Sequence, residues 1–198
     1  MTIRIKICGI TQYEDAKIAA QLGADAIGFI FSKKSPRYIS PVSAGEIIKK
    51  LPPFVVKVGV FVNESIEGIE DAVRKAGLSA VQLHGQETPD FIQRLCIPVI
   101  KAHSVKSPFK VSLINQYPAC AHLLDTWNKE LAGGTGETFD WNIAKQAVNR
   151  NIRIILAGGL GPSNLQEAID IVQPYAVDVN SGVEIKPGIK NPHKMRDA

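Results

Sequence analysis

The segment IRIILAGGLGPSNLQEAIDIVQPYAVDVNSGV, residues 152–183, holds two short apolar runs with a helix-like stretch between them. The runs Ile152–Leu156 and Ala176–Val179 are rich in β-branched residues, which favours strands. Pro162 and Ser163 are start signals for the helix that follows the first run. A strand, a helix and a second strand in this order predict a parallel βαβ unit.

The same alternation extends over the whole chain, with apolar residues at helical spacing between successive strand-like runs. Eight units in 198 residues leave about 25 residues for each. We therefore predict the α/β class and a single-domain (β/α)8 TIM barrel over residues 1–198, with parallel strands and short loops. The expected strands are Ile3–Ile7, Ala26–Phe31, Val55–Val62, Ala80–Leu83, Pro98–Ala102, Leu123–Leu124, Ile152–Leu156 and Ala176–Val179.

An open doubly wound sheet is the alternative architecture for this alternation. A dinucleotide-binding sheet has the motif G-x-G-x-x-G after its first strand, whereas this chain has Cys8-Gly9-Ile10-Thr11 there. Helix boundaries are also predicted: Thr11 and Glu14 have the spacing of a capping box, and Gly23 and Gly77 end the first and third helices.

Composition excludes several classes of protein. The chain is 45% hydrophobic and has a net charge of +4 without a run of like charges, so neither a membrane nor a nucleic acid is an expected partner. Three cysteines without CxxC, and the absence of HExxH, argue against a disulfide framework and a zinc site. Without these motifs we expect no metal. No charged region followed by an apolar one stands at Met1, so we expect a cytoplasmic location.

Two glycine-containing turns follow the last two expected strands. They are Gly158-Gly159 and Ser181-Gly182. Glycine lets a backbone approach an anion closely, and amides near a helix start suit phosphate. Because the seventh and eighth units carry the phosphate site in many barrels, we favour a phosphate site over ordinary tight turns.

Asp125 ends the sixth expected strand, where barrel enzymes place their chemistry. A carboxyl group there can donate or accept a proton, and the alternative is a cap of the following segment. The downstream loop Gly133–Gly136 could fold over a substrate or serve only as a linker.

Cys8 ends the first expected strand and is interpreted as a reactive thiol rather than a core cysteine. Lys6 lies two residues earlier on the same face, where its ammonium would stabilise a thiolate. Arg37 follows the second strand, where its guanidinium could pair with a carboxylate or be an exposed loop arginine. His84 shares a strand face with Gln82 and is either a site residue or a structural histidine.

Ordered motifs over nearly the whole chain resemble the phosphoribosylanthranilate isomerase family of tryptophan biosynthesis. They are Lys6–Thr11 (KICGIT), Ser35–Arg37 (SPR), Val58–Asn63 (VGVFVN), Gln82–Gly85 (QLHG), Leu124–Thr126 (LDT), Gly133–Gly136 (GGTG), Phe139–Trp141 (FDW), Leu156–Leu160 (LAGGL), Ser181–Glu184 (SGVE) and Pro187–Gly188 (PG).

The resemblance implies a barrel that converts N-(5-phosphoribosyl)anthranilate to its carboxyphenylamino-deoxyribulose phosphate isomer, an Amadori rearrangement without a cofactor. By this likeness Asp125 is the general acid and Cys8 the general base. Arg37 is implied as the partner of the anthranilate carboxylate, and the glycine turns as the phosphate grip. An acid at Asp125 requires a raised pKa, whereas a base at Cys8 requires an activating environment.

Two residues depart from the family pattern: Asn180 stands where serine is common, and Asn191 where aspartate is usual. The last helix also looks short. The alternatives are a related phosphosugar isomerase barrel of the histidine pathway, whose proton-transfer pair resembles two aspartates, a non-catalytic phosphometabolite-binding barrel, and a thiol-dependent hydrolase. A small phosphoribosyl molecule is the expected partner, and the chain is expected as a monomer or a homodimer.

Overall fold

The computed structural model describes residues 3–106, 108–126 and 139–198. Its strands close into one parallel barrel in which each strand pairs with the next and β8 pairs with β1. The predicted barrel and its eight strands are therefore confirmed. The strands are β1 (Arg4–Ile7), β2 (Ala26–Ile30), β3 (Val56–Phe61), β4 (Ala80–Leu83), β5 (Val99–Val105), β6 (Ala121–Thr126), β7 (Ile154–Leu156) and β8 (Ala176–Val179).

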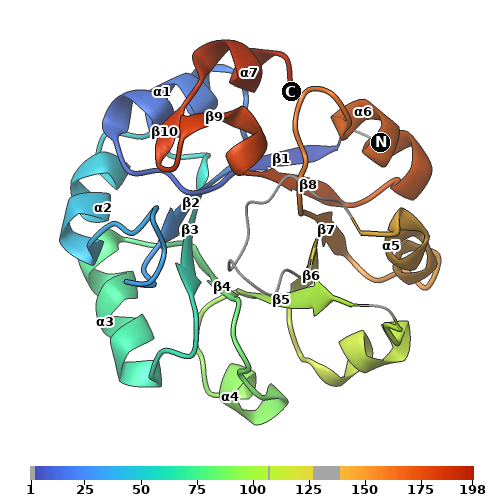
Figure 1. Cartoon of the computed structure of the whole chain (residues 1–198). Coiled ribbons are helices and arrows are strands. Elements are labelled where there is room, and N and C mark those ends of the chain that lie inside the picture. The colour runs from blue at the N-terminus through green and yellow to red at the C-terminus, as the bar shows by residue number, and fades with distance from the viewer. Residues whose placement is uncertain (1–2, 107, 127–138) are drawn as a thin grey trace.

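Helices surround the barrel as an outer ring, which Figure 1 shows end-on. A short 3₁₀ helix, η1 (Val111–Gln116), replaces an α-helix between β5 and β6. The α-helices are α1 (Tyr13–Gln21), α2 (Pro41–Ile48), α3 (Ile66–Ala76), α4 (Pro89–Gln93), α5 (Trp141–Val148), α6 (Leu165–Val172) and α7 (Pro192–Arg196).

Side chains of each strand alternate between two packed layers. Outward residues such as Ile27, Phe29 and Leu83 are buried against the helices. Inward residues such as Ala102 and Leu123 fill the barrel. Because alternation fixes which residues point inward, Lys6, Cys8 and the other polar inward residues are held inside the barrel or at its mouth.

Helix boundaries agree only in part with the sequence predictions. Gly77 has φ +74° at the end of α3, and Gly23 has φ +96° just after α1, as expected of glycines that end helices. The predicted capping box is wrong. Gln12 is the N-cap of α1, and the Thr11 hydroxyl instead donates to the Gly188 carbonyl oxygen at 2.5 Å. The Thr11 side chain thus binds the segment after β8 and does not cap α1, although its spacing from Glu14 predicts a cap.

After β8 the chain forms the 3₁₀ turn η2 (Ser181–Val183) and an antiparallel hairpin of β9 (Glu184–Lys186) and β10 (Ile189–Lys190). The terminal α7 is short, as expected, and lies with the hairpin beside α1 in Figure 1. The Lys190 amide donates to Asp15 Oδ2 on α1 at 2.9 Å. These contacts attach the end of the chain to its beginning and complete the loops around the barrel mouth.

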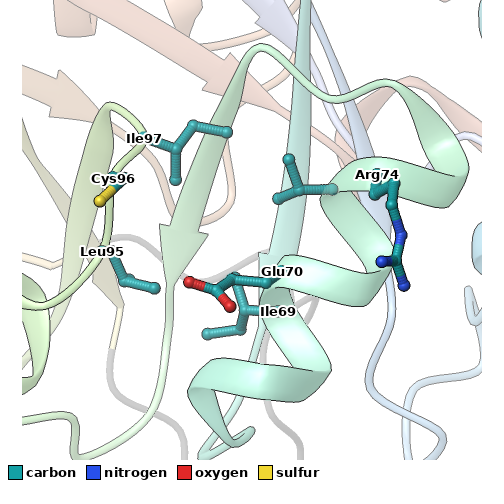
Figure 2. Close-up of a pocket in the computed structure, with 7 residues that line it drawn as sticks. Ile69, Glu70, Arg74, Leu95, Cys96 and Ile97 are labelled. Atoms are coloured by element: carbon teal, nitrogen blue, oxygen red, sulfur yellow. The ribbon is translucent and has the colours of Figure 1, made fainter.

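A pocket of about 190 Å³ lies outside the barrel, between Glu70 and Arg74 of α3 and the segment Leu95–Ile97 that leads into β5 (Figure 2). No helix in the described part of the chain is long and apolar enough to cross a membrane.

Candidate active site

Cys8 follows the last residue of β1 and is 4% exposed. A Cβ built on Gly28 of β2 would lie 2.7 Å from Cys8 Sγ and 3.1 Å from Lys6 Cε. The sulfur and the lysine side chain therefore lie side by side inside the barrel, in the space that Gly28 leaves open. The prediction that strand alternation places Lys6 and Cys8 on one side is confirmed.

Lys6 is already paired. Its Nζ donates to Asp178 Oδ2 at 2.7 Å, and the two residues are direct partners in the β1–β8 register. Lys6 lowers the pKa of the Cys8 thiol, as expected, but burial raises that pKa more strongly and Asp178 raises it further. The net pKa is above the ordinary thiol value, so the resting side chain is the thiol. The hypothesis that Lys6 favours the thiolate agrees with the direction of the contribution from Lys6, which burial outweighs in the ligand-free protein.

Asp125 lies inside β6 and its side chain is 15% exposed. Burial raises its pKa from 3.8 to about 6, with a further contribution from the charge of Asp178, while the Thr126 amide and Lys6 lower it. Asp125 does not cap α5, the first helix after it among the described residues, because the N-cap of α5 is Asp140. The environment thus supplies the raised pKa that a general acid requires near neutral pH.

His84 directly follows β4 and faces Asp125, with its Nε2 at 3.4 Å from Asp125 Oδ2. Burial lowers the pKa of His84 to about 4, so the imidazole is neutral at pH 7. Gln82 Nε2 lies 3.3 Å from His84 Nδ1. With the Gln82 amide in this orientation its nitrogen donates to Nδ1, which assigns the ring proton to Nε2, facing Asp125. The structure thus brings His84 to the candidate site.

The two glycine turns pack against each other at the barrel mouth. A Cβ on Gly182 would collide with the Leu160 carbonyl and lie 2.9 Å from Gly161 Cα. Gly158 and Gly159 have φ of +88° and +64°, and a Cβ on Gly158 would lie 2.9 Å from Asp125 Oδ1. The first turn therefore touches the candidate acid while the second closes over the first.

Several backbone amides of these turns are free to bind an anion. Those of Gly159, Leu160, Ser181 and Gly182 donate no hydrogen bond to any residue that the structure describes. Asn164 orders the first turn, because its Oδ1 accepts from the Gly161 amide at 2.9 Å and its Nδ2 donates to the Gly159 carbonyl at 3.0 Å. Clustered free amides with glycine backbones are suited to a phosphate group.

Arg37 is buried, at 6% exposure, so the alternative of an exposed loop arginine is wrong. Its Nε and Nη2 donate to both carboxylate oxygens of Glu184 at 2.6–3.1 Å. Sequence reasoning missed Glu184, which lies 147 positions away and has no local motif that marks a partner. Glu184 thus occupies the Nε–Nη2 edge of the guanidinium, and Nη1 lies on the edge that remains.

The departures from the family pattern have structural roles. Asn180 Oδ1 accepts from Lys190 Nζ at 2.9 Å, and Lys190 also donates to Glu184 Oε1 at 3.0 Å. Asn191 is the N-cap of α7, where asparagine and aspartate are comparable caps. Sequence reasoning missed Asp178 and Lys190, which gain their partners only through barrel closure and the hairpin.

No group of three or more histidine, cysteine, aspartate or glutamate side chains within residues 3–106, 108–126 and 139–198 is arranged to hold a metal ion. The loop Gly133–Gly136 lies outside the described residues.

Comparisons with known proteins identify the family to which the chain belongs. Residues 5–198 match the family model described as N-(5'phosphoribosyl)anthranilate (PRA) isomerase. A protein named N-(5'-phosphoribosyl)anthranilate isomerase from Trichlorobacter lovleyi is 50% identical, over 98% of this chain and 95% of its own. The crystal structure of the Thermotoga maritima phosphoribosyl anthranilate isomerase has a TM-score of 0.93 at 45% identity, covering 99% of this chain and 96% of that one.

A further solved structure is of a phosphoribosyl anthranilate isomerase in complex with reduced 1-(o-carboxyphenylamino)-1-deoxyribulose 5-phosphate. It is 43% identical, with a TM-score of 0.89, over 99% of this chain and 96% of that one. The chain is an isomerase and belongs to the N-(5'-phosphoribosyl)anthranilate isomerase family.

Proposed function

We propose that the chain converts N-(5-phosphoribosyl)anthranilate to 1-(2-carboxyphenylamino)-1-deoxyribulose 5-phosphate, with Asp125 as general acid and Cys8 as general base. The family's reaction belongs to tryptophan biosynthesis. One observation carries the assignment of the acid: Asp125, with its pKa raised to about 6, lies against Gly158 of the glycine turn. A carboxyl group that titrates near neutral pH thus stands next to free amides for a sugar phosphate.

Asp125 protonates the furanose ring oxygen, the C1'–O bond breaks, and the nitrogen lone pair forms an iminium ion. The Cys8 thiolate then removes the C2' proton, and its bonding electrons neutralise the iminium to give an enolamine. Transfer of a proton to C1' with loss of the C2' hydroxyl proton gives the ketone. No electron acceptor and no second substrate is needed, because the oxidation of C2' is balanced by the reduction of C1'.

The working enzyme needs a protonated Asp125 and a Cys8 thiolate. Above pH 6 the ligand-free site favours the opposite arrangement, because the pKa of Asp125 is about 6 and burial holds the thiol pKa above its ordinary value. The two arrangements carry the same number of protons. The reactive form therefore differs from the resting form only in that one proton lies on Asp125 instead of on Cys8.

Substrate binding is assigned to three groups that line the mouth. The phosphate is held by the amides of the turns at Gly158-Gly159 and Ser181-Gly182. The anthranilate carboxylate is bound by the Nη1 edge of Arg37, since Glu184 occupies the other edge. His84, whose Nε2 proton faces Asp125, contacts the ribose-derived part of the substrate near the acid.

Replacing Gly182 by alanine is expected to weaken substrate binding. The new Cβ would collide with the backbone of Leu160, and backbone cannot rotate away as a flexible side chain does. The two turns must then separate. We therefore expect KM to rise about tenfold or more, which corresponds to a loss of at least about 1.4 kcal/mol of binding free energy.

Gly23→Ala is the matched control, because Gly23 also has a positive φ but its Cβ would meet nothing within 4 Å. It is expected to lower Tm and leave KM unchanged. An unchanged KM in Gly182→Ala would refute the phosphate assignment.

The proposed function is tested by mixing the purified protein with freshly made phosphoribosylanthranilate and following the loss of substrate fluorescence. Rapid loss that yields the ketose product by chromatography is expected. Product formation from the histidine-pathway aminoimidazole substrate alone would favour the related isomerase, and tight binding without turnover would favour a non-catalytic barrel. The presence of Cys8 rather than an aspartate at the end of β1 supports the anthranilate substrate.

Location and assembly are proposed as well. All three cysteines, Cys8, Cys96 and Cys120, are free, which supports a reducing cytoplasm. A Thermotoga maritima phosphoribosylanthranilate isomerase, 42% identical over 99% of this chain, is described as dimeric, with monomers generated by mutation. For this chain we retain a monomer or a homodimer as the proposed states, and sedimentation velocity distinguishes them.

A further inference from the structure

The Lys6–Asp178 ion pair lies beside Cys8 and acts electrostatically on Asp125, yet it takes no part in the steps above. Nζ and Oδ2 are 2.7 Å apart, and both side chains are at most 7% exposed. The second carboxylate oxygen, Asp178 Oδ1, is buried and has no hydrogen-bond partner among the described residues. Desolvation offsets most of what a buried ion pair contributes to stability, so stability alone is a weak reason for this one.

The geometry puts the two charges where they act on the reaction. Lys6 Cε and Cys8 Sγ both lie close to the same point above Gly28, and Lys6 and Asp178 face each other across the β1–β8 junction. Asp178 raises the pKa values of both Cys8 and Asp125, whereas Lys6 lowers both. The pair therefore acts on the acid and the base together.

Other charged or titratable groups surround the same site. Lys190 of β10 lowers the pKa of Cys8. His84, which follows β4, faces Asp125, and Glu87 and Lys101 act on the pKa of His84. Lys190 pairs with Glu184, which also binds Arg37, and Lys101 pairs with Glu87 at 2.8 Å. Neither lysine is among the groups that shift the pKa of Asp125. Lys6 and Asp178 are therefore the pair that acts on Cys8 and Asp125 alike.

We propose that Asp178 is a positioning residue of the isomerisation. By holding the Lys6 ammonium and keeping a negative charge near Asp125, it keeps both Cys8 and Asp125 protonated up to a higher pH than either would reach without it. Without its carboxylate, the ammonium would stabilise the thiolate alone, and Asp125 would lose the neighbouring charge that favours its protonated form. This inference rests on the proposed function for its catalytic meaning but not for its electrostatics.

The test is Asp178→Asn, which keeps the shape of the side chain and removes its charge. The Cys8 pKa is measured without substrate by NMR of ¹³Cβ-labelled cysteine, in a background carrying Cys96→Ser and Cys120→Ser. We expect the thiol pKa to fall by about one unit or more, which is the shift that an uncompensated ammonium a few ångströms away produces. Both limbs of the pH profile of kcat/KM are expected to move to lower pH, with KM much less affected.

Lys6→Met is the opposing variant and is expected to raise the thiol pKa. A general loosening of the site would move both variants in the same direction, whereas the proposal requires opposite directions. Asp170→Asn, at an exposed position on α6, is the matched control and should change neither the thiol pKa nor the pH profile. If Asp178→Asn does not fold, Lys6→Met together with the Lys6→Met/Asp178→Asn double variant decides the question, since neither leaves an unpaired ammonium.

An unchanged or raised thiol pKa in Asp178→Asn, or a lowered one in Lys6→Met, would overturn the inference. In the double variant the thiol pKa is expected to stay at or above that of the wild type, and a fall would also overturn it. Isomerase activity in the wild type without the thiol shift refutes only this inference. The thiol shift without isomerase activity would instead refute the proposed function and leave the electrostatic role of the pair standing.

Discussion

Asp125→Asn is expected to lower kcat/KM by about 10²–10⁴-fold, the usual contribution of general acid catalysis. The amide has the size of the carboxyl group and keeps its place beside His84 Nε2, 3.4 Å away in the wild type, but it cannot protonate the ring oxygen. Ring opening therefore loses its proton source while the phosphate turns remain intact. Single-turnover fluorescence and binding of a reduced product analogue measure the two effects separately.

The stability of this variant distinguishes lost chemistry from lost fold. The pKa of Asp125 is raised in the folded state, from 3.8 to about 6, so its contribution to stability is lost as the pH rises through about 6. Asparagine removes the cost of ionising a buried carboxyl group. The Tm of Asp125→Asn should match the wild type near pH 4 and be at least as high at pH 8. Wild-type turnover in this variant would exclude Asp125 as the acid.

Cys8→Ser is expected to have an effect of similar size, about 10²–10⁴-fold in kcat/KM. A serine hydroxyl does not ionise near neutral pH. The neighbouring Lys6, which favours the thiolate of Cys8, therefore cannot convert a serine at this position into a base. Cys8 is 4% exposed, and the exchange of its sulfur for a smaller oxygen changes the packing little. Rapid mixing with substrate should show that binding is retained while removal of the C2' proton is slow, with a deuterium isotope effect from substrate labelled at C2'.

Cys96→Ser and Cys120→Ser serve as matched controls, because both cysteines are exposed and remote from the strand ends that form the mouth. Both should retain full turnover. If Cys8→Ser also retains it, the base is another group. A loss of both binding and turnover in Cys8→Ser would indicate a packing role instead.

Much of the architecture follows from the sequence because its signals are local. Each strand is a short β-branched run, and each helix between the runs shows its own periodicity, so the number and order of units can be counted along the chain. The boundaries were less accurate where a distant contact intervened. Thr11 has the spacing of a cap, but its hydroxyl donates to Gly188, so Gln12 begins α1 instead.

The sequence also determined where the chemistry lies. Parallel strands in a barrel bring their carboxyl ends to one mouth, so Cys8, His84 and Asp125 could be predicted to gather there from their positions alone. The glycine turns followed from the same rule. That Gly158 touches Asp125 required coordinates, because the contact depends on how β6 and β7 are staggered.

Only the tertiary structure decided how these groups are charged. Lys6 is bound to Asp178 across 172 positions and Arg37 to Glu184 across 147, and no local pattern marks either partner. Burial then raises the pKa values of Cys8 and Asp125, which neither residue type would show in water. Both effects arise when β8 closes against β1, because closure removes water from the barrel interior and brings the ends of the chain together.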